Sequence, residues 1–328
     1  MKQFIVGVDV SKATLDFFFK PTHFSMRVSN CKTGFRQWIK LLDSMRSVGD
    51  QALVIMEHTG RYSYRFESFL RAHDIAYCKI GSLQIKRSLG VIRGKNDKVD
   101  AERIAEYGWL RREVLKADHV ISDTLRELQD LLNLRLKLVR DRSGYINRFK
   151  EMKASGSCTK SDYQGKLHLQ TIAFFTRHIV ELEKKIKGII ASDTKLQTDC
   201  DLLRSIKGVG WIIACYMICR TEGFTRFCNA RKFNCYAGIA PFSHESGTSL
   251  KARSRVSHLA NKEAKTLLNL AASSAIQHDH ELKAYYLRKV AEGKSKMSCL
   301  NSVRAKLVAR MFAVIKRQTP YIEMAKAA

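Results

Sequence analysis

The start of the chain alternates short apolar stretches typical of β-strands with stretches typical of helices. Three strand-like stretches come first, FIVGVDV, TLDFFFK and FSMRVSN, and a helix-like stretch from Thr33 to Met45 separates them from a fourth, ALVIMEH. Strands with a helix between them bury a sheet face against that helix. The pattern therefore predicts an α/β domain.

The alternation continues after Gly60 with a predicted helix from Arg65 to His73, the strand IAYCKI and a helical stretch that runs towards Trp109. Three strands, a helix and a further strand form the opening order of a ribonuclease-H-like sheet. We expect residues 1–117 to form such a domain.

A different pattern begins at Ile121, where apolar residues recur at heptad spacing. The first seam is Leu125, Leu128, Leu132, Val139, Ile146 and Phe149, and after a break at Ala154 to Gly165 the second is Ile172, Phe175, Ile179, Leu182, Ile186 and Ile189. The seams predict two long helices, paired as a hairpin or coiled coil over residues 118–200. Their length also favours oligomerisation. A mainly α-helical third domain is expected over residues 201–328.

The charge of the chain predicts a polyanionic partner. Lys and Arg total 58 against 31 Asp and Glu, a formal net charge of +27. No apolar run is long enough to span a membrane, so nucleic acid is favoured over a membrane surface. Asp9 interrupts the only stretch that could serve as the apolar core of a signal peptide, which predicts a cytoplasmic, nucleoid-associated protein.

The cysteines predict reduced thiols and no zinc site. There are nine of them, and none forms a CxxC pair. Cys215 and Cys219 lie in the apolar helical run WIIACYMIC, where buried small side chains are expected more often than metal ligands.

Four acids are candidates for metal-dependent chemistry. Asp9 stands within the first strand, Glu57 ends the strand ALVIMEH, and Asp97 and Asp100 stand three apart at a helix start. Each alone also fits a structural role, as a cap, an ion-pair partner or a buried acceptor. Together they fit Mg²⁺, with Mn²⁺ as a substitute, because paired magnesium ions stabilise phosphoryl transfer.

A second group of candidates lies in HESGTSLKARSRVSHLANK. Ser246 is followed by Lys251, Arg253, Arg255 and Lys262 in what we expect to be a basic loop. This mixture suits a DNA phosphate held beside a nucleophile, or a phosphate-binding loop without chemistry. No G-x-S-x-G motif surrounds Ser246, so a serine esterase is not supported.

The segment SIKGVG precedes a predicted helix and carries Lys207, Gly208 and Gly210. It is similar to the hairpin of helix-hairpin-helix DNA-binding proteins, whose backbone N–H groups face a phosphate. A simple tight turn is the alternative. In YAGIAPF, Gly238 and Pro241 are expected to shape a turn.

The linked motifs resemble those of the IS110 family of insertion-sequence transposases, whose relatives include Piv-type pilin-gene invertases. The motifs are GVDVSK, MEHTGRY, KNDKVDAERIAE, IKGVG, YAGIAP and ESGTS, in that order. The resemblance covers nearly the whole chain. Family members commonly have a small or aliphatic residue after the glutamate, whereas this chain has His58.

The resemblance implies a RuvC-like DEDD domain in which Asp9, Glu57, Asp97 and Asp100 bind metal. It also implies that Ser246 becomes covalently joined to DNA. Donor and target double-stranded DNA, a structured bridge RNA and a homo-oligomer, a dimer that assembles to a tetramer, are the implied partners.

Two other functions are compatible with the residues. A RuvC-like hydrolytic nuclease would use metal-activated water and leave Ser246 without a role. A non-catalytic nucleic-acid-binding scaffold would need only the charge. Transposition and inversion share one chemistry.

Overall fold

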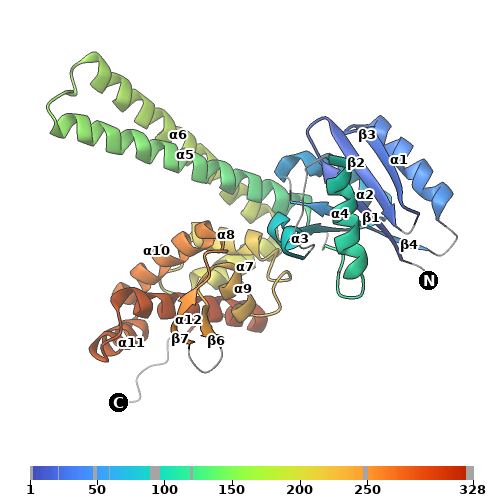
Figure 1. The fold of residues 1–328 in the computed structure, drawn as a ribbon. Coiled ribbons are helices and arrows are strands. Elements are labelled where there is room, and N and C mark those ends of the chain that lie inside the picture. The colour runs from blue at the N-terminus through green and yellow to red at the C-terminus, as the bar shows by residue number, and fades with distance from the viewer. Residues whose placement is uncertain are drawn as a thin grey trace. The chain divides into compact units, whose positions relative to one another are not determined.

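The computed structural model describes residues 3–20, 22–46, 50–58, 60–88, 97–118, 121–246 and 250–322. The chain divides into two compact units, Met1–Val120 and Ile121–Ala328 (Figure 1). The first unit is α/β and the second is mainly helical, which confirms the predicted fold class at this level.

The first unit is built on a five-stranded mixed sheet with the order β3-β2-β1-β4-β5. The strands are β1 (Gln3–Val10), β2 (Thr14–Lys20), β3 (Phe24–Ser29), β4 (Gln51–Glu57) and β5 (Ala76–Ile80). β1, β2 and β3 are antiparallel neighbours, whereas β4 runs parallel to both β1 and β5. Each strand matches one predicted from an apolar stretch, and the order is consistent with a ribonuclease-H-like opening.

One face of the sheet is covered by α1 (Lys32–Met45) and α2 (Tyr64–Ala72), which follows the short helix η1 (Gly60–Ser63). Aromatic rings fill this core: Phe17 stacks on Trp38 with ring centroids 5.2 Å apart, and Phe66 meets Trp38 edge-on at 5.1 Å. All three side chains are buried, so this face is anchored by large apolar contacts.

The opposite face carries α4 (Asp97–Leu110), which follows the short α3 (Ser82–Ser88). α4 presents small residues to the sheet. A Cβ atom at Gly7 would overlap the backbone of Ala101 and Ala105, and a Cβ at Gly108 would overlap Ile55. The helix therefore rests directly on the backbone of β1.

The second unit begins with two long helices, α5 (Asp123–Ala154) and α6 (Tyr163–Ser192), which run antiparallel along each other (Figure 1). Side-chain caps start both helices: Ser122 accepts from the Leu125 N–H and Asp162 from the Gly165 N–H. The predicted helical hairpin is confirmed, while its coiled-coil character and any oligomer stay predictions.

The predicted seams supply much of the contact between α5 and α6. Leu128, Leu132, Phe149, Ile179 and Ile186 are buried. At a polar position of the first seam, the Arg135 guanidinium pairs with Glu183 at 2.6 Å across the hairpin. The polar interruption is therefore compensated between the helices.

The rest of the second unit is a helical body that carries one β-hairpin (Figure 1). Its elements are α7 (Thr194–Arg204), α8 (Trp211–Arg220), α9 (Ala230–Tyr236), β6 (Pro241–Ser246), β7 (Leu250–Val256), α10 (Lys262–His278), α11 (His280–Ala291) and α12 (Lys296–Arg317). Cys215 and Cys219 are buried in α8 as thiols, as predicted.

The expectation of a basic loop after Ser246 was wrong. Residues 250–256 form strand β7, which pairs antiparallel with β6. The physical reason is visible in LKARSRV, where Lys251, Arg253 and Arg255 alternate with smaller or apolar residues at the two-residue period of a strand.

Within the described residues, no helix has the length and apolarity needed to cross a membrane.

The contact at Gly7 generates a test of the first unit. We expect Gly7→Ala to lower the free energy of unfolding by about 2 kcal/mol or more, because its methyl group overlaps α4 backbone that cannot rotate away. Gly81→Ala is the matched control, since a Cβ there meets nothing within 4 Å. Urea unfolding measures both, and equal stability of the two variants would contradict the direct packing of α4 on β1.

Candidate active site

Asp9 and Glu57 lie side by side at the carboxyl ends of two parallel strands. The register pairs Gly7 with Ile55 and Val8 with Met56, so each acid is the next residue beyond the last pair. Gly7 and Ile55 face α4, and a residue two positions further along a strand faces the same way. Both acids therefore lie on the α4 face of the sheet, and both are half-buried.

Helix α4 begins above these two strand ends. Gly7 lies under Ala101 and Ala105, whereas Ile5 and Ile55 lie under Gly108, so the helix runs antiparallel to β1. Its first turn, which starts at Asp97, is consequently directed towards the end of β1 that carries Asp9. The predicted helix start at Asp97 and Asp100 is confirmed.

The two acids of α4 differ in what the structure describes. Asp100 is half-buried, and its Oδ1 accepts from Arg103 at 2.8 Å, an ion pair within the helix. The backbone of Asp97 is described as the first residue of α4, while its side chain lies outside the described part. The structure thus brings Asp9 and Glu57 together and places the first turn of α4 beside them.

A further carboxylate in this row, Asp16, is absent from the set predicted from the sequence. Asp16 is the direct cross-strand partner of Asp9 in the β1–β2 ladder and is 6% exposed. Arg27 of β3 donates to its Oδ1 at 2.7 Å. Asp16 is thus neutralised by an arginine. The sequence signal for Asp16 lies in TLDFFFK. Asp16 is two residues before Phe18, so both side chains face the same side of β2, and Phe18 packs against α4.

This row of acids fits a divalent cation by donor type. Carboxylate oxygens are the ligands that hard divalent cations such as Mg²⁺ prefer. Asp9 has Asp16 on one side and Glu57 on the other. Among the side chains that the structure describes, no three acids, histidines or cysteines are already grouped closely enough to hold a metal ion.

A buried asparagine fixes the two loops that follow the acid-bearing strands. Asn30 Nδ2 donates to the Ser11 carbonyl at 2.9 Å and to the Tyr62 carbonyl at 3.1 Å. Ser11 lies two residues after Asp9, and Tyr62 lies in η1, shortly after Glu57. The Asn30 side chain therefore holds together the segments that follow β1 and β4.

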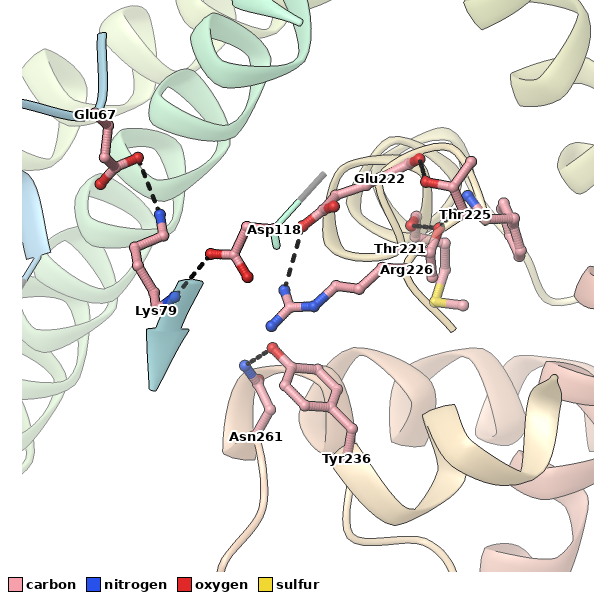
Figure 2. Close-up of polar contacts among 11 residues, drawn as sticks. Glu67, Lys79, Asp118, Thr221, Glu222, Thr225, Arg226, Tyr236 and Asn261 are labelled. Carbon is pink, nitrogen blue, oxygen red and sulfur yellow. Dashed lines mark hydrogen bonds and ion pairs between the residues drawn. The ribbon is translucent and has the colours of Figure 1, made fainter. Parts of the chain in front are cut away.

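An ion pair of the buried Glu67 anchors the segment that follows Glu57. Glu67 is fully buried and accepts from Ser63 Oγ at 2.7 Å and from Lys79 Nζ at 3.1 Å. The Lys79 N–H donates to Asp118 Oδ2 at 3.0 Å, as Figure 2 shows. Removal of one partner would leave a buried charge, so this network fixes η1 against β5.

The predicted nucleophile occupies the far end of the β6–β7 hairpin in the second unit. Ser246 is the last residue of β6 and pairs with Leu250, the first residue of β7. Its side chain and residues 247–249 lie outside the described part. The serine is therefore placed at the end of strand β6.

The base of this hairpin is closed by polar contacts between α9 and α10. Asn261 donates from its backbone to the Tyr236 carbonyl at 2.8 Å and from Nδ2 to Tyr236 Oη at 2.7 Å, the contact drawn in Figure 2. Asn261 Oδ1 accepts from the Ala264 N–H at 2.8 Å and so caps α10. It also accepts from Tyr216 Oη at 3.2 Å, and burial raises the pKa of that phenol.

The basic residues predicted to bind nucleic acid are distributed around the hairpin. Arg255 in β7 and Lys262 at the start of α10 are exposed. Lys251 and Arg253 occupy alternate positions of β7 with Arg255, and their side chains lie outside the described part.

The predicted hairpin at SIKGVG connects α7 to α8. Gly208 has a φ of +90°, and a Cβ there would lie 2.6 Å from the Ala271 carbonyl oxygen of α10. Gly210 ends the turn as the exposed N-cap of α8 with ordinary φ, and Lys207 is exposed. Gly208 is thus required by packing, while Lys207 and Gly210 face solvent.

Comparison with known proteins gives two family matches. Residues 6–152 match a family described as "Transposase", of the DEDD type of IS110 elements, and residues 200–287 match the "Transposase IS116/IS110/IS902 family". The first match contains all four predicted metal-binding acids, and the second contains Ser246.

Two curated relatives are similar over most of the chain. The pilin gene-inverting protein of Moraxella bovis is 24% identical over 330 aligned positions, which cover 98% of each chain. The transposase for insertion sequence element IS1111A of Coxiella burnetii is 21% identical over 292 positions, 82% of this chain and 79% of that protein.

The two glycines of the α7–α8 turn form a matched pair of variants. We expect Gly208→Ala to destabilise the second unit by about 2 kcal/mol, because the residue combines a left-handed φ with a close approach to α10. Gly210→Ala meets nothing within 4 Å and should cost about 1 kcal/mol or less, as an N-cap substitution does. Chemical denaturation decides, and equal losses would contradict the packing role of Gly208.

Proposed function

This chain belongs to the IS116/IS110/IS902 family of transposases and is a DNA recombinase or transposase, and on that premise we propose that it cuts and rejoins DNA through a covalent bond to Ser246. The observation that carries its metal-dependent part is the β1–β4 register, which sets Asp9 beside Glu57 under the first turn of α4, and Ser246 is assigned from its place in the second matched segment. A structural role for isolated acids does not require this convergence.

We assign Asp9, Glu57, Asp97 and Asp100 as the metal-binding acids of a RuvC-like domain. Mg²⁺, or Mn²⁺ in its place, would supply charge to polarise the scissile phosphate and steady the leaving oxygen. Asp9 is paired with β2 and Glu57 with β5 in the sheet, and Asn30 restrains the loops beyond them. Such support keeps the acids oriented during the reaction.

In the proposed step, Ser246 Oγ attacks the phosphorus of a phosphodiester. A bond from Oγ to phosphorus forms, the bond to one DNA oxygen breaks, and that oxygen takes up the proton that the serine hydroxyl gives up. Attack by a hydroxyl of a second DNA end reverses the exchange and frees the serine. Bond energy is retained throughout, so no nucleotide hydrolysis is needed.

The partners we propose are donor and target double-stranded DNA together with a structured bridge RNA. The formal net charge of +27 supports binding of long polyanions, since each neutralised phosphate releases counterions. We also propose a homo-oligomer, a dimer that assembles to a tetramer, in which the acids and the serine come from different protomers.

The covalent step is tested with purified protein, the bridge RNA, labelled donor and target DNA and Mg²⁺ on denaturing gels. Wild type should give a labelled protein band. Ser246→Ala should abolish that band together with cleavage, and Asp9→Asn should lower cleavage by about a thousandfold, because each removes a group the transition state needs. Chelation of the metal should act like Asp9→Asn.

Two variants control for general damage. Ser243→Ala changes another serine of β6, and Asp43→Asn changes an exposed acid of α1, so both should keep wild-type activity. Cleavage that survives Ser246→Ala would refute the serine step and favour a hydrolytic nuclease. Cleavage that survives both Asp9→Asn and chelation would refute the metal assignment.

Inversion is the second candidate, because one relative that aligns with nearly the whole chain is a pilin gene-inverting protein. A plasmid with two recombination sites in inverted orientation, incubated with a separate target plasmid, separates the two. As a transposase, the protein should join donor ends to the target plasmid. Restriction fragments of a reversed segment, without joined plasmids, would instead establish an invertase.

A further inference from the structure

A cationic pocket of about 880 Å³ lies at the base of the β6–β7 hairpin, within the second unit. Residues of the hairpin base, α9, α10, α11 and the first three turns of α12 line it. Its arginines and lysine are Arg231, Arg255, Lys265 and Arg304, His258 also lines it, and none of its described lining residues is an aspartate or glutamate. Ile239, Ala240 and Pro241 of the YAGIAP motif form part of its lining, whereas Arg304 lies outside both matched segments.

Arg304 is the unusual member, because it is 3% exposed and has no carboxylate partner among the described residues. Its Nη1 donates to Asn301 Oδ1 at 3.2 Å and its Nη2 donates to Asn269 Oδ1, while its Nε has no hydrogen-bond partner in the described part of the chain. Burial lowers the pKa of Arg304, yet guanidinium groups keep their proton in proteins.

Arg310, two turns further along α12, shows the usual solution for such a side chain. Its guanidinium contacts Asp279 Oδ2 and Glu281 Oε2, each at 2.6 Å. A buried charge without a counter-charge is strongly unfavourable, so structural arginines are paired in this way. Arg304 is held in place by two amides that orient its guanidinium but do not neutralise it.

We infer that the pocket around Arg304 binds a backbone phosphate of the DNA strand on which Ser246 acts, an assignment that rests on the proposed function. A planar guanidinium matches two phosphate oxygens, and Arg255 and Lys265 add charge at the rim. Ser298 in the first turn of α12 lines the pocket, so the positive end of the α12 dipole also favours an anion there.

The hairpin sets which phosphate this is. Pro241 and Arg255 at its base line the pocket, while Ser246 stands at its other end. Six extended residues of β6 span roughly 16 Å to 20 Å, so the phosphate in the pocket is a flanking one rather than the scissile one. The pocket would hold the DNA strand in register by this flanking phosphate while the scissile phosphate reacts.

The test measures binding of fluorescein-labelled donor DNA to the full chain by anisotropy, without Mg²⁺, over a series of salt concentrations. Arg304→Gln should weaken binding roughly tenfold and reduce the salt slope by about one. Arg304→Lys should fall between, since it keeps the charge and loses the fork. Lys316→Gln removes an exposed charge at the end of α12, outside the pocket lining, and should change binding less than about twofold.

Circular dichroism establishes that each variant is folded. If Arg304→Gln does not fold, the rim variant Lys265→Gln replaces it, with the same expected direction. Binding by a folded Arg304→Gln within about twofold of wild type, with an unchanged salt slope, would overturn the inference. A loss confined to an RNA oligonucleotide of the same sequence would overturn the assignment to DNA.

The two proposals fail separately. A wild-type protein that forms no covalent adduct, combined with weaker DNA binding by Arg304→Gln, would sink the serine step and support the pocket. If wild type forms the adduct, and Arg304→Gln changes neither the adduct yield nor DNA binding, the serine step stands and the pocket assignment fails. In DNA with single methylphosphonates near the cut, wild type should be sensitive at one flanking position, and Arg304→Gln should lose that sensitivity.

Discussion

The close packing of α4 on the backbone of β1 is the constraint on which the first unit depends. At Gly7 the helix contacts the strand without an intervening side chain, and Ala101 and Ala105 are the residues that allow it. This contact sets the height and direction of α4. Since the helix runs antiparallel to β1, its acidic first turn is directed towards the strand end that carries Asp9. Gly7, two residues before Asp9 on the same face of β1, therefore determines how the first turn of α4 lies above the strand ends.

That arrangement concentrates negative charge, and arginines form ion pairs with some of these acids. Arg27 offsets Asp16 and Arg103 offsets Asp100, so the outer acids are paired within the protein. Asp9 lies between Asp16 and Glu57 in the row of strand ends. The buried Glu67 and Lys79 pair and the clamp at Asn30 hold the adjoining loops and add no exposed charge at the strand ends. A cation is the ligand that such a row of acids best accommodates.

Much of this could be predicted from the sequence, because the relevant signals are local. Apolar runs give the strands of the first unit, heptad spacing gives α5 and α6, and an acid within an apolar strand marks Asp9. What escaped prediction depends on pairing between segments. Asp16 gains meaning only when β2 is set against β1, and Asn30 only when two loops are brought to it. The basic segment after Ser246 was misassigned because its polar and basic composition resembles that of a loop, although its alternation has the period of a strand.

Arg304 illustrates the same limit and suggests how to read buried arginines in this helical body. Arg220 contacts Glu263 at 3.0 Å, and Arg310 contacts two carboxylates, so both charges are satisfied by the fold itself. In the sequence all three stand among apolar residues of helices and look alike. Only the tertiary structure shows that the partners of Arg304 are amides, which fix a guanidinium without cancelling its charge. A fold gains no stability from a buried cation left uncompensated, whereas a site for an anionic ligand requires one, and this difference separates a binding arginine from a structural one.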